Sequence, residues 1–354
     1  MIDKENISLD WINKVAKEHK VTDKILIEKV IRALLLLEGL ALQKIPFIFK
    51  GGTALMLHLD SSKRLSIDID IIVSEQIDDF EKQLTLIADK QNFNKTEPQH
   101  REVNSKIKKA HYKFYYTPLH KTNKNEEYIL LDVLFEDIQY QKIIELPVRL
   151  KFIPSVEEDA IVKIPSIEDL LGDKLTAFAP NTTGIPYFKK DDSMSMEIIK
   201  QLYDIDTLFD KAENLTIIKE TFLRFVKTEF SYRNESGTIN DVLEDIYKTA
   251  LCITTRGTDG DGNFNELLSG IKRVAGFIFS ENYHIEKAIV SASKAAYLAT
   301  IIECEALVIE KFENLLQMKD WIISEPMNNK LNKLKKSNPE SFFYWYKIFE
   351  IKRK

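Results

Sequence analysis

Residues 46–73 read PFIFKGGTALMLHLDSSKRLSIDIDIIV, and this stretch decides the fold of the N-terminal half of the chain. It opens with a short apolar run, which Gly51-Gly52 breaks before a series of good helix formers, so it predicts a strand, a tight turn and a helix. Paired glycines let backbone amides approach a ligand closely, and the helix N-terminus behind them favours phosphate. The hydroxyl of Thr53 could cap that helix or contact the same phosphate. The plain alternative is a helix entered through a Gly-Gly turn.

The second half of this stretch, residues 64–73, alternates apolar with polar residues, which is the period of a strand with one buried face. Asp68 and Asp70 therefore point to the same face, about 7 Å apart along the strand. Two carboxylates so placed can converge on one or two Mg²⁺ ions. By itself such a pair is more typical of a solvated strand face, and the preceding glycine turn is what favours a metal and phosphate site. The sequence contains neither G-x-x-x-x-G-K-[ST] nor G-x-G-x-x-G, so it has no P-loop or dinucleotide fingerprint.

A third candidate carboxylate, Asp132, lies near the middle of the apolar, strand-like run 127–135. Burying an unpaired carboxylate costs several kcal/mol. This aspartate therefore needs a metal ion, a cationic partner or an exit to the surface.

Two helical segments carry further candidates. Residues 167–178 predict a helix whose apolar stripe includes Lys174, which must either snorkel to solvent or face a cleft that holds an anion. Given the carboxylates elsewhere, we favour contact with a nucleotide phosphate. Residues 196–210 predict a second helix with Asp204 and Asp206 near its apolar face, and helical geometry alone does not choose between them. An ion pair of Asp204 with Lys200, one turn earlier, is the alternative to a functional role.

The motif Lys50-Gly51-Gly52-Thr53-Ala54-Leu55, followed by Arg64-x-Ser66-x-Asp68-Ile69-Asp70, resembles the first motif of the AbiEii/AbiGii toxin family of nucleotidyltransferase-fold proteins. Members are toxins of bacterial toxin-antitoxin pairs, several of them linked to phage defence. The segments IEDLLGDKLTAF (167–178) and KQLYDI (200–205) resemble the lysine motif and the final aspartate motif of the family. The resemblance runs from about residue 26 to about residue 209. Many members carry an acidic residue where Gln201 stands, which leaves the role of that position open.

The resemblance implies a magnesium-dependent nucleotidyltransferase that moves a nucleoside monophosphate from an NTP to an RNA, such as a tRNA, or to a protein. Asp68 and Asp70, with Asp132, would hold Mg²⁺, and the Gly51-Gly52-Thr53 turn would hold the β and γ phosphates. Lys174 would add positive charge, and the family position favours Asp204 over Asp206 for orienting Lys174 or the nucleotide. A cognate antitoxin or regulator is the expected partner. Two other functions stay open: a non-catalytic nucleotide-binding interaction protein, and a nucleotidyltransferase acting on a small molecule of the aminoglycoside type.

A chain of 354 residues is long enough for two domains. We predict an α/β domain over residues 1–165, with a nucleotidyltransferase-fold mixed sheet and flanking helices, and a mostly α-helical domain over residues 166–354 that contributes Lys174 and Asp204 to the active site. The element ranges that we expect, besides those above, are helices over 10–19, 23–41, 77–91 and 285–312 and strands over 111–117 and 146–152.

Composition narrows the class of protein. A net charge of −5 does not suggest a general nucleic-acid binder, and two cysteines argue against a disulfide framework. The sequence begins without the charged and then apolar pattern of a signal peptide, and the apolar stretch 34–42 is too short to span a bilayer, so we expect a cytoplasmic protein without membrane contact.

Local basic clusters keep RNA open as an acceptor, although such runs are usually solvated surfaces. Their members are Arg101, Lys106, Lys108, Lys109, His111 and Lys113; Lys330, Lys333, Lys335 and Lys336; and Lys352, Arg353 and Lys354. The polar loop 181–195 is predicted either as a mobile flap that places Lys189 and Lys190 near phosphates or as a plain solvated connector.

Overall fold

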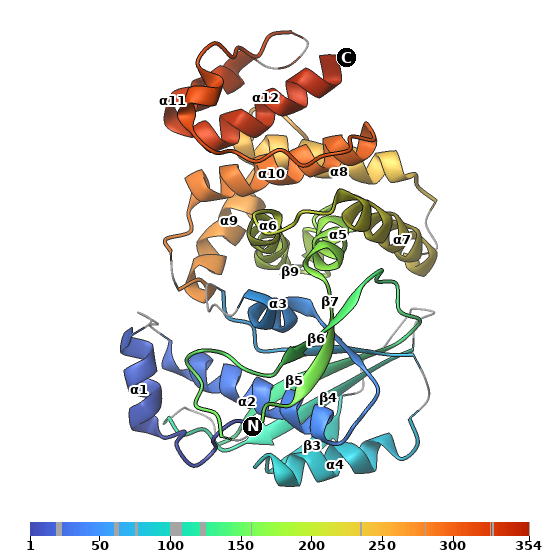
Figure 1. Cartoon of the computed structure of the whole chain (residues 1–354), viewed down its shortest axis with the longest axis vertical. Helices are drawn as coiled ribbons and strands as arrows, with labels where there is room; N and C mark the ends of the chain where they lie inside the picture. The colour runs from blue at the N-terminus through green and yellow to red at the C-terminus, as the bar shows by residue number, and fades with distance from the viewer. Residues whose placement is uncertain are drawn as a thin grey trace. The chain divides into compact units, whose positions relative to one another are not determined.

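The computed structural model describes the 354-residue chain except for residues 19–22, 60–63, 75–76, 100–107, 121–124, 157, 234–235, 280, 326, 328 and 354. The chain forms two compact units (Figure 1). The N-terminal unit comprises Met1–Ser166 together with Gly276–Asn282, and the C-terminal unit comprises Ile167–Ala275 together with Tyr283–Lys354. The return of residues 276–282 to the N-terminal unit was not predicted from the sequence.

The N-terminal unit is built on a five-stranded sheet with the order β1-β2-β5-β4-β3. The strands are β1 (Ile48–Lys50), β2 (Ile69–Val73), β3 (Lys95–Pro98), β4 (Lys108–Tyr116) and β5 (Glu127–Phe135). β2 and β5 run parallel, whereas the other neighbouring pairs are antiparallel. The sheet is therefore mixed, as predicted. β2 is shorter than the predicted strand 64–73, because only an isolated bridge from Arg64 to Ile278 precedes it.

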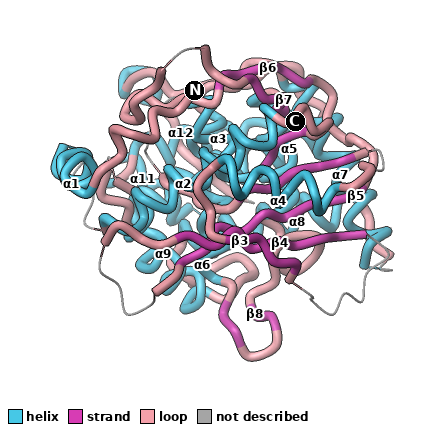
Figure 2. The backbone as a smooth tube through the Cα atoms, turned by 90° about the horizontal axis from the view of Figure 1, so that it is seen from below, coloured by secondary structure: helices cyan, strands magenta, loops and turns pink. Residues whose placement is uncertain are grey.

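Helices cover the apolar face of this sheet. α2 (Lys24–Leu42) and α4 (Phe80–Lys90) lie against it, as Figures 1 and 2 show, while α1 (Leu9–Glu18) packs beside α2. Asp23 starts α2 by accepting hydrogen bonds from the backbone N–H groups of Ile25 and Leu26. Ile69 and Ile71 of β2 are fully buried on this face, so the alternating Asp70 points to the other one.

The N-terminal unit also contains a separate two-stranded sheet. β6 (Ile143–Pro147) and β7 (Ile161–Pro165) pair antiparallel. The predicted strand over 146–152 is wrong except for its first two residues. Pro147 ends β6, and the chain then turns before β7.

The C-terminal unit is predominantly helical, as predicted. Its main helices are α5 (Ile167–Ala177), α6 (Ser195–Phe209), α7 (Leu215–Arg233), α8 (Ile239–Thr254), α9 (Phe264–Val274), α10 (Ile285–Glu303) and α12 (Pro339–Arg353), and α11 (Leu334–Ser337) is a single turn. α5 packs on α6 and α7, and α10 packs on α6, α8 and α12. Within the described ranges, no helix combines the length and apolarity needed to cross a bilayer.

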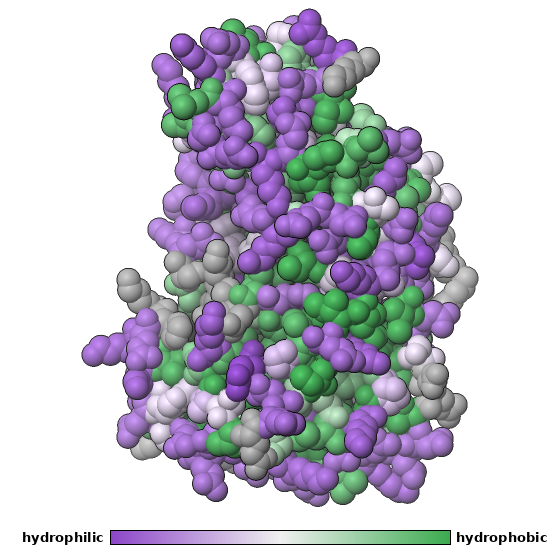
Figure 3. All heavy atoms as spheres, in the orientation of Figure 1, coloured by the Kyte–Doolittle hydropathy of each residue, from purple (hydrophilic) through white to green (hydrophobic). Residues whose placement is uncertain are grey.

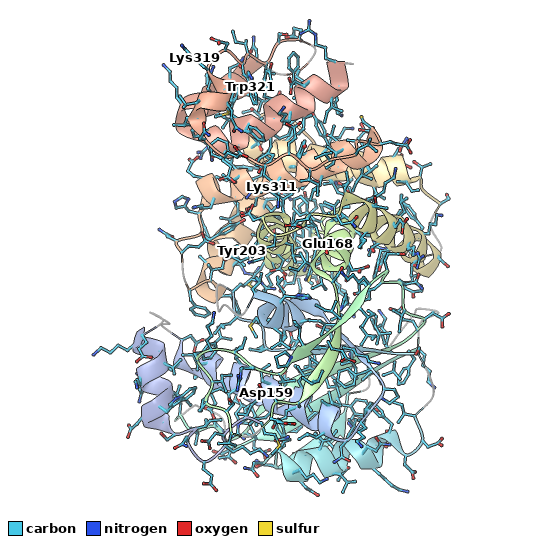
Figure 4. The ribbon with its side chains drawn as sticks, in the orientation of Figure 1. Asp159, Glu168, Tyr203, Lys311, Lys319 and Trp321 are labelled. Atoms are coloured by element: carbon cyan, nitrogen blue, oxygen red, sulfur yellow. The ribbon has the colours of Figure 1, made fainter. Side chains whose placement is uncertain are left out.

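The predicted helix 285–312 is too long, because α10 ends at Glu303. Glu305 adopts φ +53°, and the N–H of Ala306 donates to the carbonyl of Ile301, which closes the helix with a left-handed turn. Residues 304–322, which we call the strap, then run over the helices. Figure 4 marks Lys311, Lys319 and Trp321 along it.

The strap is held by polar contacts yet exposes apolar side chains. The backbone N–H groups of Glu310 and Phe312 donate to the hydroxyls of Tyr297 and Tyr344. Figure 3 shows hydrophobic residues interspersed with hydrophilic ones on the visible face of this unit. Leu307 and Leu316 of the strap are 92% and 86% exposed.

Candidate active site

The glycine turn joins β1 directly to α3 (Gly51–Leu59). Gly51 adopts φ +82°, a conformation that residues with a side chain rarely take. A Cβ atom built on Gly51 would lie 2.3 Å from Oδ2 of Asp70. The turn therefore lies directly against the Asp70 carboxylate, and only glycine leaves room for it.

Replacing Gly51 by alanine should cost activity more than stability. The left-handed backbone adds about 1–2 kcal/mol of strain, and the new methyl group must displace the Asp70 carboxylate. Since a 1 Å misplacement can cost about 100-fold in rate, we expect nucleotide transfer to fall at least that far. Gly276→Ala in the same unit is the matched control, because a Cβ there meets no atom within 4 Å. Equal transfer rates for the two variants would contradict the close approach.

The Arg-x-Ser element packs against the second glycine. A Cβ atom on Gly52 would lie 2.6 Å from Nη2 of Arg64 and 2.8 Å from Oγ of Ser66. Arg64 is buried, and the backbone N–H of the next residue, Leu65, donates to the carbonyl of Phe277. This packing gives a physical reason for the spacing between the glycines and the Arg-x-Ser pair.

Thr53 connects the turn to the acidic strand. Its hydroxyl donates a hydrogen bond of 2.7 Å to the backbone carbonyl of Asp68. The sequence offered a helix cap or a phosphate contact for this hydroxyl, and the structure shows a third use. The bond fixes the beginning of α3 beside the beginning of β2.

Four polar side chains form one row across the sheet, which we call the carboxylate row. Lys50 of β1 stands opposite Asp70 of β2, Asp70 stands beside Asp132 of β5, and Asp132 stands opposite His111 of β4. Residues directly opposite each other on neighbouring strands point to the same face. The structure thus brings the two predicted acids of separate strands together, next to Gly51.

The donor set of this site fits a hard divalent cation. Asp70 and Asp132 are half-buried and Asp68, the residue before β2, is exposed. All three offer carboxylate oxygens, the ligands that Mg²⁺ prefers. In the described part of the chain, no three His, Cys, Asp or Glu side chains are gathered closely enough to form a complete metal site. Asp70 and Asp132 therefore form the core of the candidate metal site. Asp68 lies two residues before Asp70 in the sequence, and its side chain is exposed.

His111 belongs to the row although the sequence placed it in a solvated basic cluster. Its side chain is only 12% exposed, and Nδ1 lies 2.6 Å from Oδ1 of Asp132. Only the strand register, which no local pattern reveals, places it there. In the same predicted cluster, Arg101 and Lys106 lie outside the described residues, as does Lys354 of the third cluster.

The C-terminal unit holds the predicted lysine and aspartate as a pair. Nζ of Lys174 on α5 lies 3.1 Å from Oδ2 of Asp204 on α6. The two side chains are 9% and 0% exposed. Lys174 therefore does not extend into solvent, one of the two alternatives for it, and its contact with a nucleotide phosphate remains a prediction. Lys200, the alternative partner of Asp204 in the sequence, lies 3.8 Å from Glu197.

Asp206, the competing aspartate on α6, belongs to a different cluster. Nζ of Lys294 on α10 lies 2.6 Å from Asp206, 2.7 Å from Asp210 and 2.9 Å from Glu340. Burial alone would lower the pKa of Lys294, but the three carboxylates outweigh it and hold that pKa above its ordinary value. This cluster joins α6, α10 and α12. The contacts therefore separate Asp204 from Asp206, which helical geometry could not.

The loop 181–195 is more structured than predicted. β8 (Phe188–Lys189) and β9 (Asp192–Ser193) form a short hairpin in it. Its first residues are fixed by Asp245 of α8, which accepts hydrogen bonds from Asn181 and Thr182. Burial raises the pKa of Asp245, and these hydrogen bonds oppose the rise. The tip with Lys189 and Lys190 remains exposed, and its proximity to phosphates remains a prediction.

A cavity of about 830 Å³ lies elsewhere in the N-terminal unit. It is found where β2 and β5 end, at Val73 and Phe135, and Phe80 of α4 lines it. Among the described residues that line it, none belongs to the carboxylate row. We therefore do not assign it to the candidate active site.

Comparison with known proteins gives a family and two similar structures. The crystal structure of JHP933 from Helicobacter pylori has 16% sequence identity and a TM-score of 0.41, covering 80% of this chain and 94% of its own. A candidate nucleotidyltransferase from the same organism has 16% identity and a TM-score of 0.42, covering 80% of this chain and 97% of its own. No curated protein matches the sequence. The family model described as "Nucleotidyl transferase AbiEii toxin, Type IV TA system" matches residues 35–270, two thirds of the chain, so this protein belongs to the AbiEii family of nucleotidyltransferase toxins of type IV toxin-antitoxin systems.

Proposed function

We propose that this nucleotidyltransferase uses Mg²⁺ to transfer a nucleoside monophosphate from an NTP to an RNA, such as a tRNA, or to a protein. The observation that carries the proposal is the register of Asp70 with Asp132, with Gly51 packed against the Asp70 carboxylate. Phosphoryl transfer depends mainly on positioning and charge stabilisation, and this arrangement offers both. Transfer forms a bond between the acceptor oxygen and the α-phosphorus and breaks the bond to the departing pyrophosphate.

In this proposal Asp70 and Asp132 hold the metal, and the exposed side chain of Asp68 would turn towards it on binding, because no three such side chains are already gathered among the described residues. Bound Mg²⁺ would neutralise phosphate charge and favour deprotonation of the acceptor hydroxyl. The backbone N–H groups at Gly51 and Gly52 and the N-terminus of α3 would bind the β and γ phosphates. Because the Thr53 hydroxyl already donates to Asp68, Thr53 would contribute its backbone N–H.

We further propose that the C-terminal unit supplies Lys174 to the nucleotide phosphates. Asp204 would hold the ammonium group in position, since its buried carboxylate lies 3.1 Å from Nζ. A buried ion pair needs both partners, because removing one leaves an uncompensated charge. The cognate antitoxin or regulator is the expected cellular counterpart of this activity.

Replacing Lys174 by methionine tests this role. The change keeps the aliphatic stem but removes the charge, so we expect transfer to fall about 100-fold, equivalent to about 2.7 kcal/mol of transition-state stabilisation. Lys219→Met is the matched control, since Lys219 pairs with Glu305 at 3.2 Å on the exposed surface of the same unit. An unchanged rate for Lys174→Met, with the variant folded, would exclude Lys174 from the site.

The acceptor can be identified directly. The purified protein is incubated with each of the four α-labelled NTPs, Mg²⁺ and either total RNA or a protein lysate. Label in one fraction names the acceptor class, and the NTP that supplies it names the base. Label in neither fraction, with pyrophosphate released only when small hydroxylated compounds are added, would instead support the small-molecule function. Nucleotide binding without pyrophosphate release under all these conditions would support the interaction protein.

A further inference from the structure

The proposed function gives no role to His111, a member of the carboxylate row. It comes from β4, two strands away from the aspartate motif on β2. Nothing in the sequence near it, KKAHYKFYY, resembles a motif. Its position is set by the register that places it opposite Asp132.

The contact between the two side chains has a definite direction. Nδ1 of His111 lies 2.6 Å from Oδ1 of Asp132, a short hydrogen-bond distance. A carboxylate can only accept, so Nδ1 carries the proton and donates it. The bond occupies Oδ1 of Asp132 and fixes the rotation of the carboxylate. Oδ2 is then the oxygen available to a cation.

The surroundings make this contact more than a surface ion pair. The His111 side chain is 12% exposed and that of Asp132 is 28% exposed. Both belong to a continuous strand pair, so their backbones hold the two groups together without further ordering. Carboxylates that bind metals are themselves usually hydrogen-bonded by a group outside the metal's own ligands, and losing that group typically costs about 10–100-fold in metal affinity or activity.

We propose that His111 is a positioning residue that orients Asp132 for binding a divalent cation beside Asp70. The inference rests on the proposed function, because it takes Asp132 to be a metal ligand. It goes further by assigning a role to a residue on a strand that no motif marks. His111 acts through Asp132 and does not itself hold the cation.

Two substitutions separate the hydrogen bond from the shape of the ring. His111→Phe keeps an aromatic ring on β4 but removes the donor. His111→Asn loses the ring, yet its side-chain amide can donate from nearly the place of Nδ1. A packing role predicts that phenylalanine is the milder change, whereas a positioning role predicts that asparagine is.

His120→Phe is the matched control. This histidine also contacts a carboxylate in the N-terminal unit, with Nδ1 3.4 Å from Oε2 of Glu28, and its side chain is 16% exposed. Glu28 lies on α2, on the opposite side of the sheet from the row. The control therefore loses a similar contact without disturbing Asp132.

Two measurements on the full chain test the proposal. The first is Mn²⁺ binding, monitored by the loss of the electron paramagnetic resonance signal of the free ion. The second is the transfer rate as a function of Mg²⁺ concentration. We expect His111→Phe to weaken Mn²⁺ binding and to raise the Mg²⁺ requirement by about 10–100-fold. His111→Asn should recover most of the loss, and His120→Phe should match the wild type. Circular dichroism confirms that each variant is folded.

Failure of the inference can be told apart from failure of the proposed function. If the wild type binds Mn²⁺ and Asp70→Asn does not, but His111→Phe binds as tightly as the wild type, the positioning role is wrong and the proposed function stands. If His111→Phe weakens Mn²⁺ binding less than His111→Asn does, the positioning role is likewise wrong and the proposed function stands. If wild type and Asp70→Asn bind Mn²⁺ equally weakly, the metal site is wrong and the role of His111 falls with it.

Discussion

Replacing Asp70 by asparagine is expected to abolish nucleotide transfer and leave the fold intact. Asp70 stands at the centre of the carboxylate row, between Lys50 and Asp132, and against Gly51. A bound metal contributes several kcal/mol of charge stabilisation, and about 4 kcal/mol corresponds to a thousandfold in rate. We therefore expect transfer to fall at least about a thousandfold, measured with labelled NTP under saturating Mg²⁺.

The same variant should be about as stable as the wild type in the absence of metal. Asparagine relieves the repulsion from Asp132 but gives up the attraction of Lys50 on the other side, so the two effects oppose each other. Added Mg²⁺ should raise the melting temperature of the wild type, since it binds only the folded state, but not that of Asp70→Asn. Asp89→Asn on the exposed surface of α4 is the control and should keep both transfer and the Mg²⁺ effect. Full transfer by Asp70→Asn would end the assignment of the active site.

Replacing Lys294 by methionine should cause a large loss of stability. Methionine keeps most of the buried stem but leaves Asp206, Asp210 and Glu340 facing one another without a cation. Breaking a buried ion pair costs 3–5 kcal/mol. Because Asp210 and Glu340 reach solvent, we expect about 3 kcal/mol less free energy of unfolding, measured by urea denaturation.

This loss should depend on pH. The difference from the wild type should shrink only at high pH, where Lys294 loses its charge. In the wild type, the pKa of Lys294 is raised above its ordinary value of 10.5. The contribution of Lys294 to the free energy of unfolding is therefore fully present below pH 10.5 and is lost only as the pH rises through the raised pKa. Lys248→Met, which breaks an exposed pair with Glu244 at 2.9 Å, should cost no more than about 0.5 kcal/mol. A similar loss for both variants would show that the cluster is not what stabilises the unit.

The sequence predicted those parts of the site that local pattern determines. The Gly-Gly pattern predicted the turn at Gly51, and alternation predicted the strand that carries Asp70, although Asp68 lies just before it. The apolar run around Asp132 predicted a strand, and its isolated acid pointed to a need for a cation. The helical second half followed from the same kind of periodicity, and the mixed sheet followed from the resemblance to the family.

What sequence could not give was the register between strands. That Asp132 stands beside Asp70, and His111 opposite Asp132, depends on pairings over 62 and 21 residues along the chain, which the sum of packing across the whole sheet decides. Helical geometry likewise could not show that Asp204 pairs with Lys174 and Asp206 with Lys294, because each pairing depends on a second helix.

The remaining errors come from turns made without glycine. α10 ends because Glu305 takes a left-handed conformation, and the hairpin β8–β9 turns through Lys190 at φ +56°. Glycine or asparagine usually marks such positions, so lysine and glutamate gave no signal. The strand predicted over 146–152 was apolar enough, but Pro147 ends β6 within it.

Because residues 276–282 belong to the N-terminal unit, some contacts of that unit can form only late in translation. Ile278 bridges to Arg64, and Phe277 accepts a hydrogen bond from Leu65, right beside the second glycine of the turn. A nascent chain that has released only its first 166 residues from the ribosome lacks both contacts. The loop carrying the Arg-x-Ser pair therefore acquires its final neighbours only after more than 100 further residues have been translated. The protein thus completes this loop late, when most of the polypeptide already exists.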